Sequence, residues 1–268
     1  MNEANPFDQQ KPIDGVKHII AISSGKGGVG KSTVCSNLAI ALAQQEQKVG
    51  ILDADIYGPS QPRMMGALNQ KPMVNAENKI QPIERHGIKI MSMGLLVEED
   101  MAVAWRGPML FKAMNQLFYE VHWGELDYLL IDLPPGTGDV QLSMVQKVPV
   151  DGAITVCTPQ NIALADVKKS LDMFERVKVP NLGVMENMSF LPSPTDPQEK
   201  IQIFPKGDLR AYLDSRSIPL LGELPLLPDM AMACEMGIPY VAQKSSESVS
   251  NSFEQLAKRC IQELSIEA

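Results

Sequence analysis

The chain has 268 residues, 44% of them apolar, and carries a formal net charge of −8. This length is within reach of one large α/β domain, and the apolar content is enough for a sizeable core. The acidic charge argues against nucleic acid as the main partner, because phosphate binding needs a basic face. No run of eighteen apolar residues occurs, so we expect no membrane span, and the polar start "MNEANPFDQQKPIDG" lacks the apolar segment of a secretion signal.

The polar first residues, 1–16, predict a flexible arm, and residues 17–268 predict a single domain. Short apolar segments predict buried strands at 16–23, 48–55, 88–93, 127–134, 152–159, 180–186 and 219–226. Helical patterns lie at 32–45, 108–122, 139–146, 162–177 and 248–264. Continuous apolar strands are typical of a parallel sheet that helices cover on both faces. The sequence therefore predicts an α/β fold with a doubly wound, mostly parallel sheet flanked by helices.

The segment "SSGKGGVGKST", residues 23–33, lies between the first predicted strand and the first predicted helix. Its glycines and the final Gly-Lys-Ser match the P-loop spacing, in the strand–loop–helix context that this motif requires. Glycines let successive backbone N–H groups point at phosphate oxygens, and the helix N-terminus adds its positive dipole end. We expect Lys31 to bridge the β- and γ-phosphates of ATP and the Ser32 hydroxyl to hold Mg²⁺. The residues predicted to contact the nucleotide here are Gly25, Lys26, Gly27, Gly28, Val29, Gly30, Lys31, Ser32 and Thr33.

Two later strands end in carboxylates. Asp53 and Asp132 follow apolar segments as in the Walker B pattern, whose carboxylate orders Mg²⁺ directly or through water. Asp55 follows in the loop, where it could orient the attacking water. A strand-end Asp can instead cap a helix or form a turn, but the neighbouring P-loop favours the metal role. Lys26 adds a charge that its own nucleotide does not obviously need, so it is either solvated or reaches a phosphate bound by a second copy of the chain.

These motifs resemble a known family. "GKGGVGKST" resembles the deviant Walker A of the MinD-type P-loop ATPases, and "GILDADIYGPS", "WRGPM", "DYLLIDLPPGTGD", "TPQNIALAD" and "GVMENMS" resemble the Mrp/ApbC branch. The likeness runs from about Gly15 to the C-terminal helix. It implies a homodimer that binds Mg²⁺ and ATP near its interface and hydrolyses ATP. We expect the turnover to be slow, because such a switch gains from a long-lived ATP-bound state. The likeness also implies that Lys26 acts across the dimer beside the catalytic Lys31 and Asp55, and that Asn187 reads adenine.

The segment after "ENMS" departs from the family. Relatives carry a CxxC pair there, and two such pairs would hold one [4Fe–4S] cluster between subunits. The matching residues here are "FLPSPTDPQEKIQIFPKGD", in which Ser193 is a poor substitute for a soft thiolate. The four cysteines, Cys35, Cys157, Cys234 and Cys260, are isolated in the sequence, and we expect them to be small buried apolar residues. The cluster is thus implied by the resemblance, while its ligands are not identified.

The resemblance favours a function in iron–sulfur cluster assembly or transfer to client apoproteins. The partner would be a second copy of the chain or a related ATPase subunit. The alternative is a MinD/ParA-like nucleotide-switched positioning ATPase without a cluster, which the missing CxxC favours. The absence of a basic amphipathic tail argues against membrane recruitment of such a switch, and the acidic charge argues against DNA binding. A kinase is a weaker candidate, because no acceptor-substrate motif is found. No disulfide framework is indicated, so we expect a cytoplasmic protein.

Overall fold

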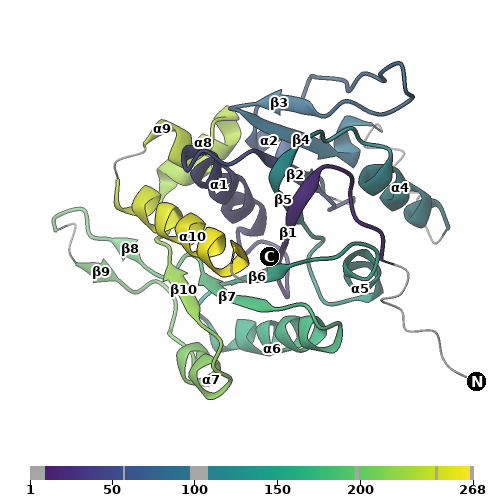
Figure 1. Ribbon diagram of the computed structural model, residues 1–268. Coiled ribbons are helices and arrows are strands. Elements are labelled where there is room, and N and C mark those ends of the chain that lie inside the picture. Colours follow the sequence, from purple (N-terminus) through teal and green to yellow (C-terminus); the bar gives the residue numbers. More distant parts are fainter. Residues whose placement is uncertain (1–9, 57, 97–107, 197–198, 245–246, 266–268) are drawn as a thin grey trace, which may run out of the picture.

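The computed structural model describes residues 10–56, 58–96, 108–196, 199–244 and 247–265 (Figure 1). In these residues one eight-stranded sheet has the order β10-β7-β6-β1-β5-β2-β4-β3, and a two-stranded sheet pairs β8 with β9. The strands are β1 (Val16–Ser23), β2 (Val49–Asp53), β3 (Ile83–Arg85), β4 (Ile88–Ser92), β5 (Leu126–Asp132), β6 (Gly152–Cys157), β7 (Asn181–Glu186), β8 (Leu191–Pro192), β9 (Lys200–Ile201) and β10 (Leu220–Glu223). The helices are α1 (Lys31–Gln44), α2 (Gln61–Met64), α4 (Pro108–Tyr119), α5 (Asp139–Val145), α6 (Asn161–Arg176), α7 (Leu209–Ser215), α8 (Pro228–Met236), α9 (Tyr240–Gln243) and α10 (Ser248–Ser265), with a short 3₁₀ turn at Met93–Leu95.

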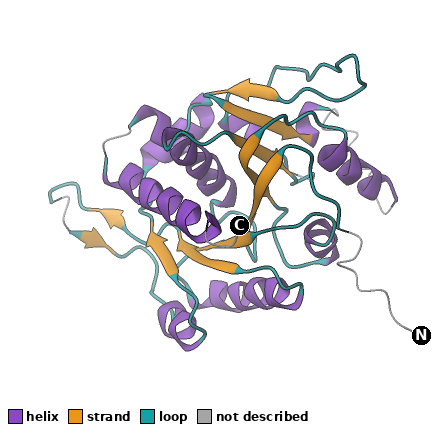
Figure 2. Cartoon of the chain, in the orientation of Figure 1, coloured by secondary structure: helices purple, strands orange, loops and turns teal. Residues whose placement is uncertain are grey.

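Helices cover both faces of the large sheet (Figures 1 and 2). On one face α1, α8, α9 and α10 pack against side chains such as Ile20 and Ile22 of β1. On the other face α4, α5 and α6 pack against Ile19 and Ala21 of the same strand. Successive residues of a strand point to opposite faces, so a strand buried on both sides needs a continuous apolar run. The predicted doubly wound sheet flanked by helices is confirmed.

All neighbouring strands of this sheet run parallel except β3, which pairs antiparallel with β4 at the edge. The carboxyl ends of the parallel strands therefore meet at one edge. The chain leaves β1 through α1 toward β2 on one side, and leaves β6 through α6 toward β7 on the other. Connections that diverge in this way leave a crevice beyond the strand ends, which is where open α/β sheets bind ligands.

The predicted helix 108–122 ends early, at Tyr119. The residues after it pair with a distant loop: Val121 forms a β-bridge with Ile80, and the His122 backbone N–H donates to the Ile80 carbonyl at 2.8 Å. The other predicted helices agree with the structure to within one residue at each end. The elements that the sequence did not predict, α2, α7, α8, α9, β3, β8 and β9, have two to nine residues each, too few for a clear periodicity.

Four of the sequence features fall partly outside the described residues. These are residues 1–9 of the predicted arm, residue 57 of "GILDADIYGPS", residues 105–107 of "WRGPM" and residues 197–198 of "FLPSPTDPQEKIQIFPKGD". Among the helices that the structure describes, none is long and apolar enough to cross a membrane.

Candidate functional site

The loop between β1 and α1 depends on glycine for its shape. Gly28 and Gly30 have φ angles of 78° and 85°, in the left-handed region that favours glycine. A Cβ on Gly30 would lie 2.2 Å from Asn187 Nδ2, and one on Gly25 would lie 2.4 Å from Asp166 Cβ. The loop is therefore both curled and tightly enclosed by later parts of the chain.

A cavity of about 370 Å³ opens beside this loop. It lies over the start of α1, where the first turn has no acidic residue and no side chain caps the helix. The N–H groups of that turn remain available to an anion, and the helix dipole favours negative charge there. The cavity is lined by Ser24, Gly27, Gly28, Gly30, Lys31, Ser32, Thr33, Asp55, Gly58, Ser60, Met64, Pro135 and Met188.

Lys31 is almost fully buried at the base of this cavity, with 6% of its side chain exposed. Its Nζ donates to Asp132 Oδ1, and it lies 3.3 Å from Ser32 Oγ. Burial disfavours the charged ammonium, but the adjacent Asp132 carboxylate outweighs this effect, so the pKa of Lys31 lies above its ordinary value. The site thus holds a permanent cation where a phosphate would bind.

Asp53 and Asp132 are register partners at the ends of β2 and β5, and both are fully buried. Asp53 Oδ2 accepts from the backbone N–H of Ser60 at 2.9 Å and of Gln61 at 3.0 Å, and from Ser92 Oγ at 3.2 Å. Burial, together with the Asp132 carboxylate, raises the pKa of Asp53 to about 7. Paired carboxylate oxygens beside a hydroxyl are the hard donors that Mg²⁺ prefers. The donor set therefore fits Mg²⁺, and Asp53 also fixes the loop that follows β2.

Asp55 and Lys26 lie at different places relative to the cavity. Asp55 lines it, and its Oδ1 accepts from the Gly58 backbone N–H at 3.2 Å. Lys26 is half-buried in the phosphate loop but does not line the cavity. Asp55 therefore faces the cavity beside the phosphate loop of the same chain, and Lys26 does not.

Asn187 follows β7 directly and is 95% buried. Its Nδ2 donates to the Val29 carbonyl at 2.9 Å, and its backbone N–H donates to the Cys157 carbonyl at 2.7 Å. Asn187 thus ties the end of β7 to the phosphate loop, 158 residues earlier in the chain. The next residue, Met188, has a φ of 55° and lines the cavity.

Gln61 is a residue of this site that the sequence reasoning did not single out. It is fully buried, and its Nε2 donates to Asp132 Oδ2 at 2.8 Å and to the Ser32 carbonyl at 3.0 Å. Its place in "GPSQP", eight residues after the Asp53 that ends β2, was the available signal. Ser24, Ser60, Ser92, Pro135 and Met188 were also not predicted, because their roles depend on contacts between distant segments.

The segment in which the family resemblance implies a CxxC contains the paired strands β8 and β9. Ser193 is buried there, and its Oγ lies 3.1 Å from Thr195 Oγ1. Within the described part of the chain, no group of three or more His, Cys, Asp or Glu side chains could hold a metal ion. The hairpin itself offers no soft ligand for iron.

The cysteines do not compensate for this loss. Cys35, Cys157 and Cys260 are buried as expected, and Cys234 is half-buried with its Sγ 3.6 Å from Thr33 Oγ1. Burial raises the pKa of each thiol, that of Cys260 to about 12. The thiolate is the form that binds iron, so these four side chains do not fit a cluster in this conformation.

Comparison with known proteins identifies the family. Residues 15–261 match the family model described as the NUBPL iron-transfer P-loop NTPase of the ParA group. The chain belongs to this family. It is 47% identical to the iron–sulfur cluster carrier protein of Aquifex aeolicus over 254 residues, which cover 94% of this chain and 70% of that one.

Solved structures agree with this membership of the NUBPL-type NTPases. A nucleotide-binding protein from Archaeoglobus fulgidus, in complex with ADP, is 37% identical with a TM-score of 0.76, covering 89% of this chain and 92% of that one. The septum site-determining protein MinD of Pyrococcus horikoshii, complexed with Mg-ADP, is 25% identical with a TM-score of 0.70, covering 94% and 98%. The resemblance to Mrp/ApbC and MinD-like ATPases is thereby confirmed.

Proposed function

We propose that this protein is a Mg²⁺-dependent ATPase that works as a homodimer in iron–sulfur cluster assembly or transfer to apoproteins. The observation that carries the ATPase part is the buried Lys31 beside Ser32 and Asp132, at the base of a cavity formed by the phosphate loop. Bound ADP in the Archaeoglobus fulgidus structure supports the nucleotide. The name of the Aquifex aeolicus relative supports the iron–sulfur role.

The geometry suggests how the phosphate site would work. Lys31 would exchange its Asp132 partner for the β- and γ-phosphates of ATP. Ser32, Asp132 and Asp53 would hold Mg²⁺ directly or through water, which neutralises charge on the phosphates. Asp55, on the cavity wall, would orient the attacking water.

Two further residues would act at the edges of this site. Asn187 would release the Val29 carbonyl and use its side-chain amide to read adenine. Lys26, which does not line its own cavity, would stabilise the phosphate of the second subunit, as an arginine finger supplied in trans does. The free thiols suit a reducing compartment, and we propose that the protein acts in the cytoplasm.

The iron–sulfur cluster is the cargo of this function, and its thiolates would come from another chain. The buried cysteines and the thiol-free hairpin do not fit cluster ligation by this chain alone. A related ATPase subunit that carries the family CxxC, or the client itself, would supply the soft ligands. The protein described here would then contribute nucleotide-driven assembly and release.

Anaerobic reconstitution with iron and sulfide tests this proposal. We expect the chain alone to bind almost no iron and to lack the broad visible absorption of a cluster. Mixed with a CxxC-bearing family member and ATP, it should increase the rate at which cluster reaches an apoprotein, and Lys31→Ala should abolish the increase.

Two outcomes would contradict the proposal in different ways. About four irons per dimer of the chain alone, as in one [4Fe–4S] cluster, would show that its own cysteines ligate the cargo. No iron together with no effect on transfer would exclude the iron–sulfur role and favour the nucleotide-switched positioning ATPase.

A further inference from the structure

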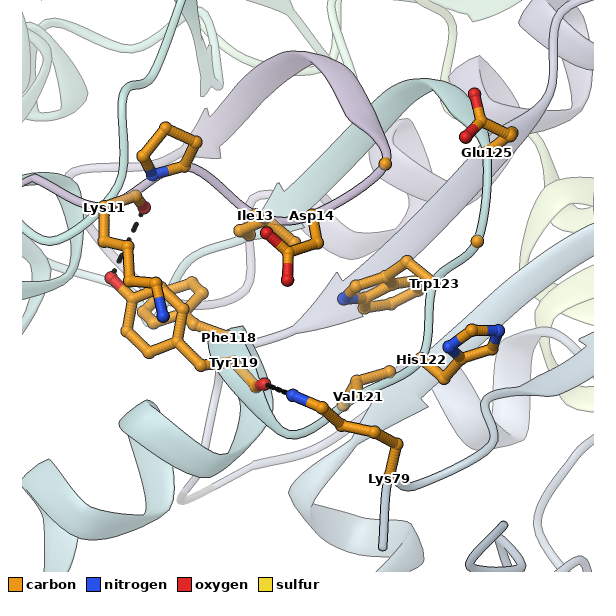
Figure 3. A pocket seen from close by; sticks show the side chains of 13 residues that line it. Lys11, Ile13, Asp14, Lys79, Phe118, Tyr119, Val121, His122, Trp123 and Glu125 are labelled. Atoms are coloured by element: carbon orange, nitrogen blue, oxygen red, sulfur yellow. Dashed lines mark hydrogen bonds between the residues drawn. The ribbon is translucent and has the colours of Figure 1, made fainter. Parts of the chain in front are cut away.

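A second cavity, of about 230 Å³, lies at the amino ends of β1 and β5 (Figure 3). Its walls include residues 11–15, which precede β1, and residues 121–125, which precede β5. The phosphate loop follows the other end of β1, eight residues away, and a strand of that length spans about 25 Å. The second cavity is therefore separate from the nucleotide site.

The floor of this cavity contains a buried donor without an acceptor. Trp123 is 99% buried, and among the described residues nothing accepts a hydrogen bond from its Nε1. Figure 3 shows Nε1 at the edge of the indole that faces the Asp14 carboxylate across the cavity. A buried donor left unpaired is costly, and in native structures such a group usually has a protein, water or ligand partner.

The indole is held in this position by the sheet. A Cβ on Gly50 of β2 would lie 3.0 Å from Trp123 Cζ3, so the benzo edge of the ring packs closely against that strand. Lys89 of β4 donates to the Trp123 carbonyl. The benzo edge of the ring is therefore held against β2 and the Trp123 backbone is held by Lys89, while the N–H edge of the indole remains directed into the cavity.

Charges of both signs surround the apolar floor. The Lys11 ammonium lies 5.2 Å from the centre of the Tyr119 ring, and the Lys79 ammonium donates to the Tyr119 carbonyl at 2.5 Å. Each lysine has three N–H donors, so one such contact leaves others for a ligand. Asp14 and Glu125 contribute exposed carboxylates to the same rim.

We propose that this cavity binds a small zwitterion of amino-acid size. Its carboxylate would accept from Trp123 Nε1 and the two lysines, and its ammonium group would face Asp14. Its apolar part would rest on Phe118 and the Tyr119 ring, both of which line the cavity. The volume, which corresponds to about eight waters at roughly 30 Å³ each, suits such a molecule. A phosphate would be repelled by the carboxylates, and a simple cation by the lysines.

Nuclear magnetic resonance of the indole N–H tests this proposal directly. The chain has two tryptophans, Trp105 and Trp123, so a Trp105→Phe variant leaves one indole resonance to follow. Titration with L-alanine should move this resonance along a saturating curve. Acetate and methylammonium, each carrying one charge, should bind about tenfold more weakly or worse. A resonance that does not saturate with L-alanine, or equal midpoints for the three probes, would overturn the proposal.

Two matched variants test separately how the ammonium group and the carboxylate of the ligand are bound. Asp14→Asn removes an exposed charge from the rim and should weaken L-alanine binding about tenfold, while acetate, which has no ammonium group, should bind no more weakly than before. Glu120→Gln, an exposed carboxylate nearby that does not line the cavity, should leave both unchanged. Unaltered L-alanine binding in Asp14→Asn would refute the ammonium subsite. These measurements do not depend on ATP or iron, so their result is independent of the proposed function.

Discussion

Lys31 and Asp132 form a buried ion pair in the structure, and this pair sets the chemistry of the phosphate site. Two charges removed from water are stable only when their geometry and further hydrogen bonds compensate for the lost hydration. Here Gln61 donates a hydrogen bond to the second oxygen of Asp132. Asp132 therefore keeps a donor when Lys31 moves to a phosphate, which makes the exchange of partners feasible.

Lys31→Ala should lower the ATP hydrolysis rate by about 10²–10³-fold, because the charge on the transferring phosphoryl group loses its closest cation. Steady-state phosphate release measures the effect. Lys17→Ala, which removes an exposed lysine of β1, is the control and should retain full activity. Unchanged, nucleotide-dependent turnover in Lys31→Ala would refute the assignment of the phosphate site.

Gly30→Ala should destabilise the protein by about 1–3 kcal/mol, because it forces a Cβ into the left-handed region. The same Cβ would meet Asn187 Nδ2 at 2.2 Å, so the contact between β7 and the phosphate loop should break. Urea unfolding and nucleotide affinity measure the two effects. Gly138→Ala is the matched control, since its φ is −88° and its Cβ would meet nothing within 4 Å. Equal stability of both variants would contradict this account.

At the scale of elements, the phosphate site lies at the carboxyl ends of the strands. At their amino ends, the side chain of Asp127 links neighbouring strands by hydrogen bonds. Asp127, the second residue of β5, accepts from the Lys17 ammonium of β1 at 2.5 Å and from the Lys48 backbone N–H before β2 at 2.9 Å. The Lys17 hydrogen bond, with that of Lys48, lowers the pKa of Asp127. One side chain thus joins three adjacent strands of the sheet.

The lowered pKa of Asp127 means that the folded state favours its charged form. This contribution to stability is present above the unfolded-state pKa, near 4, and is lost as the pH falls through the folded-state value. Because Lys17 is exposed, we expect Asp127→Asn to cost only about 0.5 kcal/mol at pH 7. The difference from wild type should vanish near pH 2, measured by urea unfolding at both values. A difference of the same size at both pH values would contradict an electrostatic role.

The sequence predicted the long elements well because their periodicity is local. Helices α1 and α6 and the apolar strands around β1 and β5 were placed to within one or two residues. Short elements such as α2 and the β8–β9 hairpin were not predicted, since two to four residues show no period. The end of α4 was misplaced because a tertiary bridge to Ile80 competes with the helix.

At the scale of the whole molecule, the proposed role of Lys26 depends on a second subunit that faces the phosphate loop. Lys26 sits in the loop but not on the cavity wall. A cation in this position is useful if a second subunit faces the loop, because it would then meet the partner's phosphate. The proposed homodimer would thus complete each active site from two chains.

A mixed-dimer experiment tests this arrangement. Lys26→Ala should lose hydrolysis while it keeps most of its nucleotide binding, and Asp55→Asn should behave in the same way. In an equal mixture, half of the dimers combine the two variants and have one site with all its residues. The activity should return to about a quarter of the wild-type value. No recovery, with mixed dimers shown to form, would place Lys26 in its own site.

The flexible arm at 1–16 and the single domain at 17–268 stay predictions. So do the roles assigned to the site residues, although the structure gathers Lys31, Ser32, Asp55 and Asp132 around one cavity or its base.

The sequence by itself determined the phosphate loop, the apolar strands that build the sheet and the missing CxxC, because each of these depends on residues that are close together in the chain. Only the tertiary structure decided that Asn187 holds the Val29 carbonyl, that Gln61 supports Asp132, and that three of the four cysteine thiols are buried while Cys234 is half-buried. It also created the cavity that Trp123 lines, whose walls come from segments more than a hundred residues apart. Contacts of this kind depend on the packing of the whole sheet, and no local pattern specifies them.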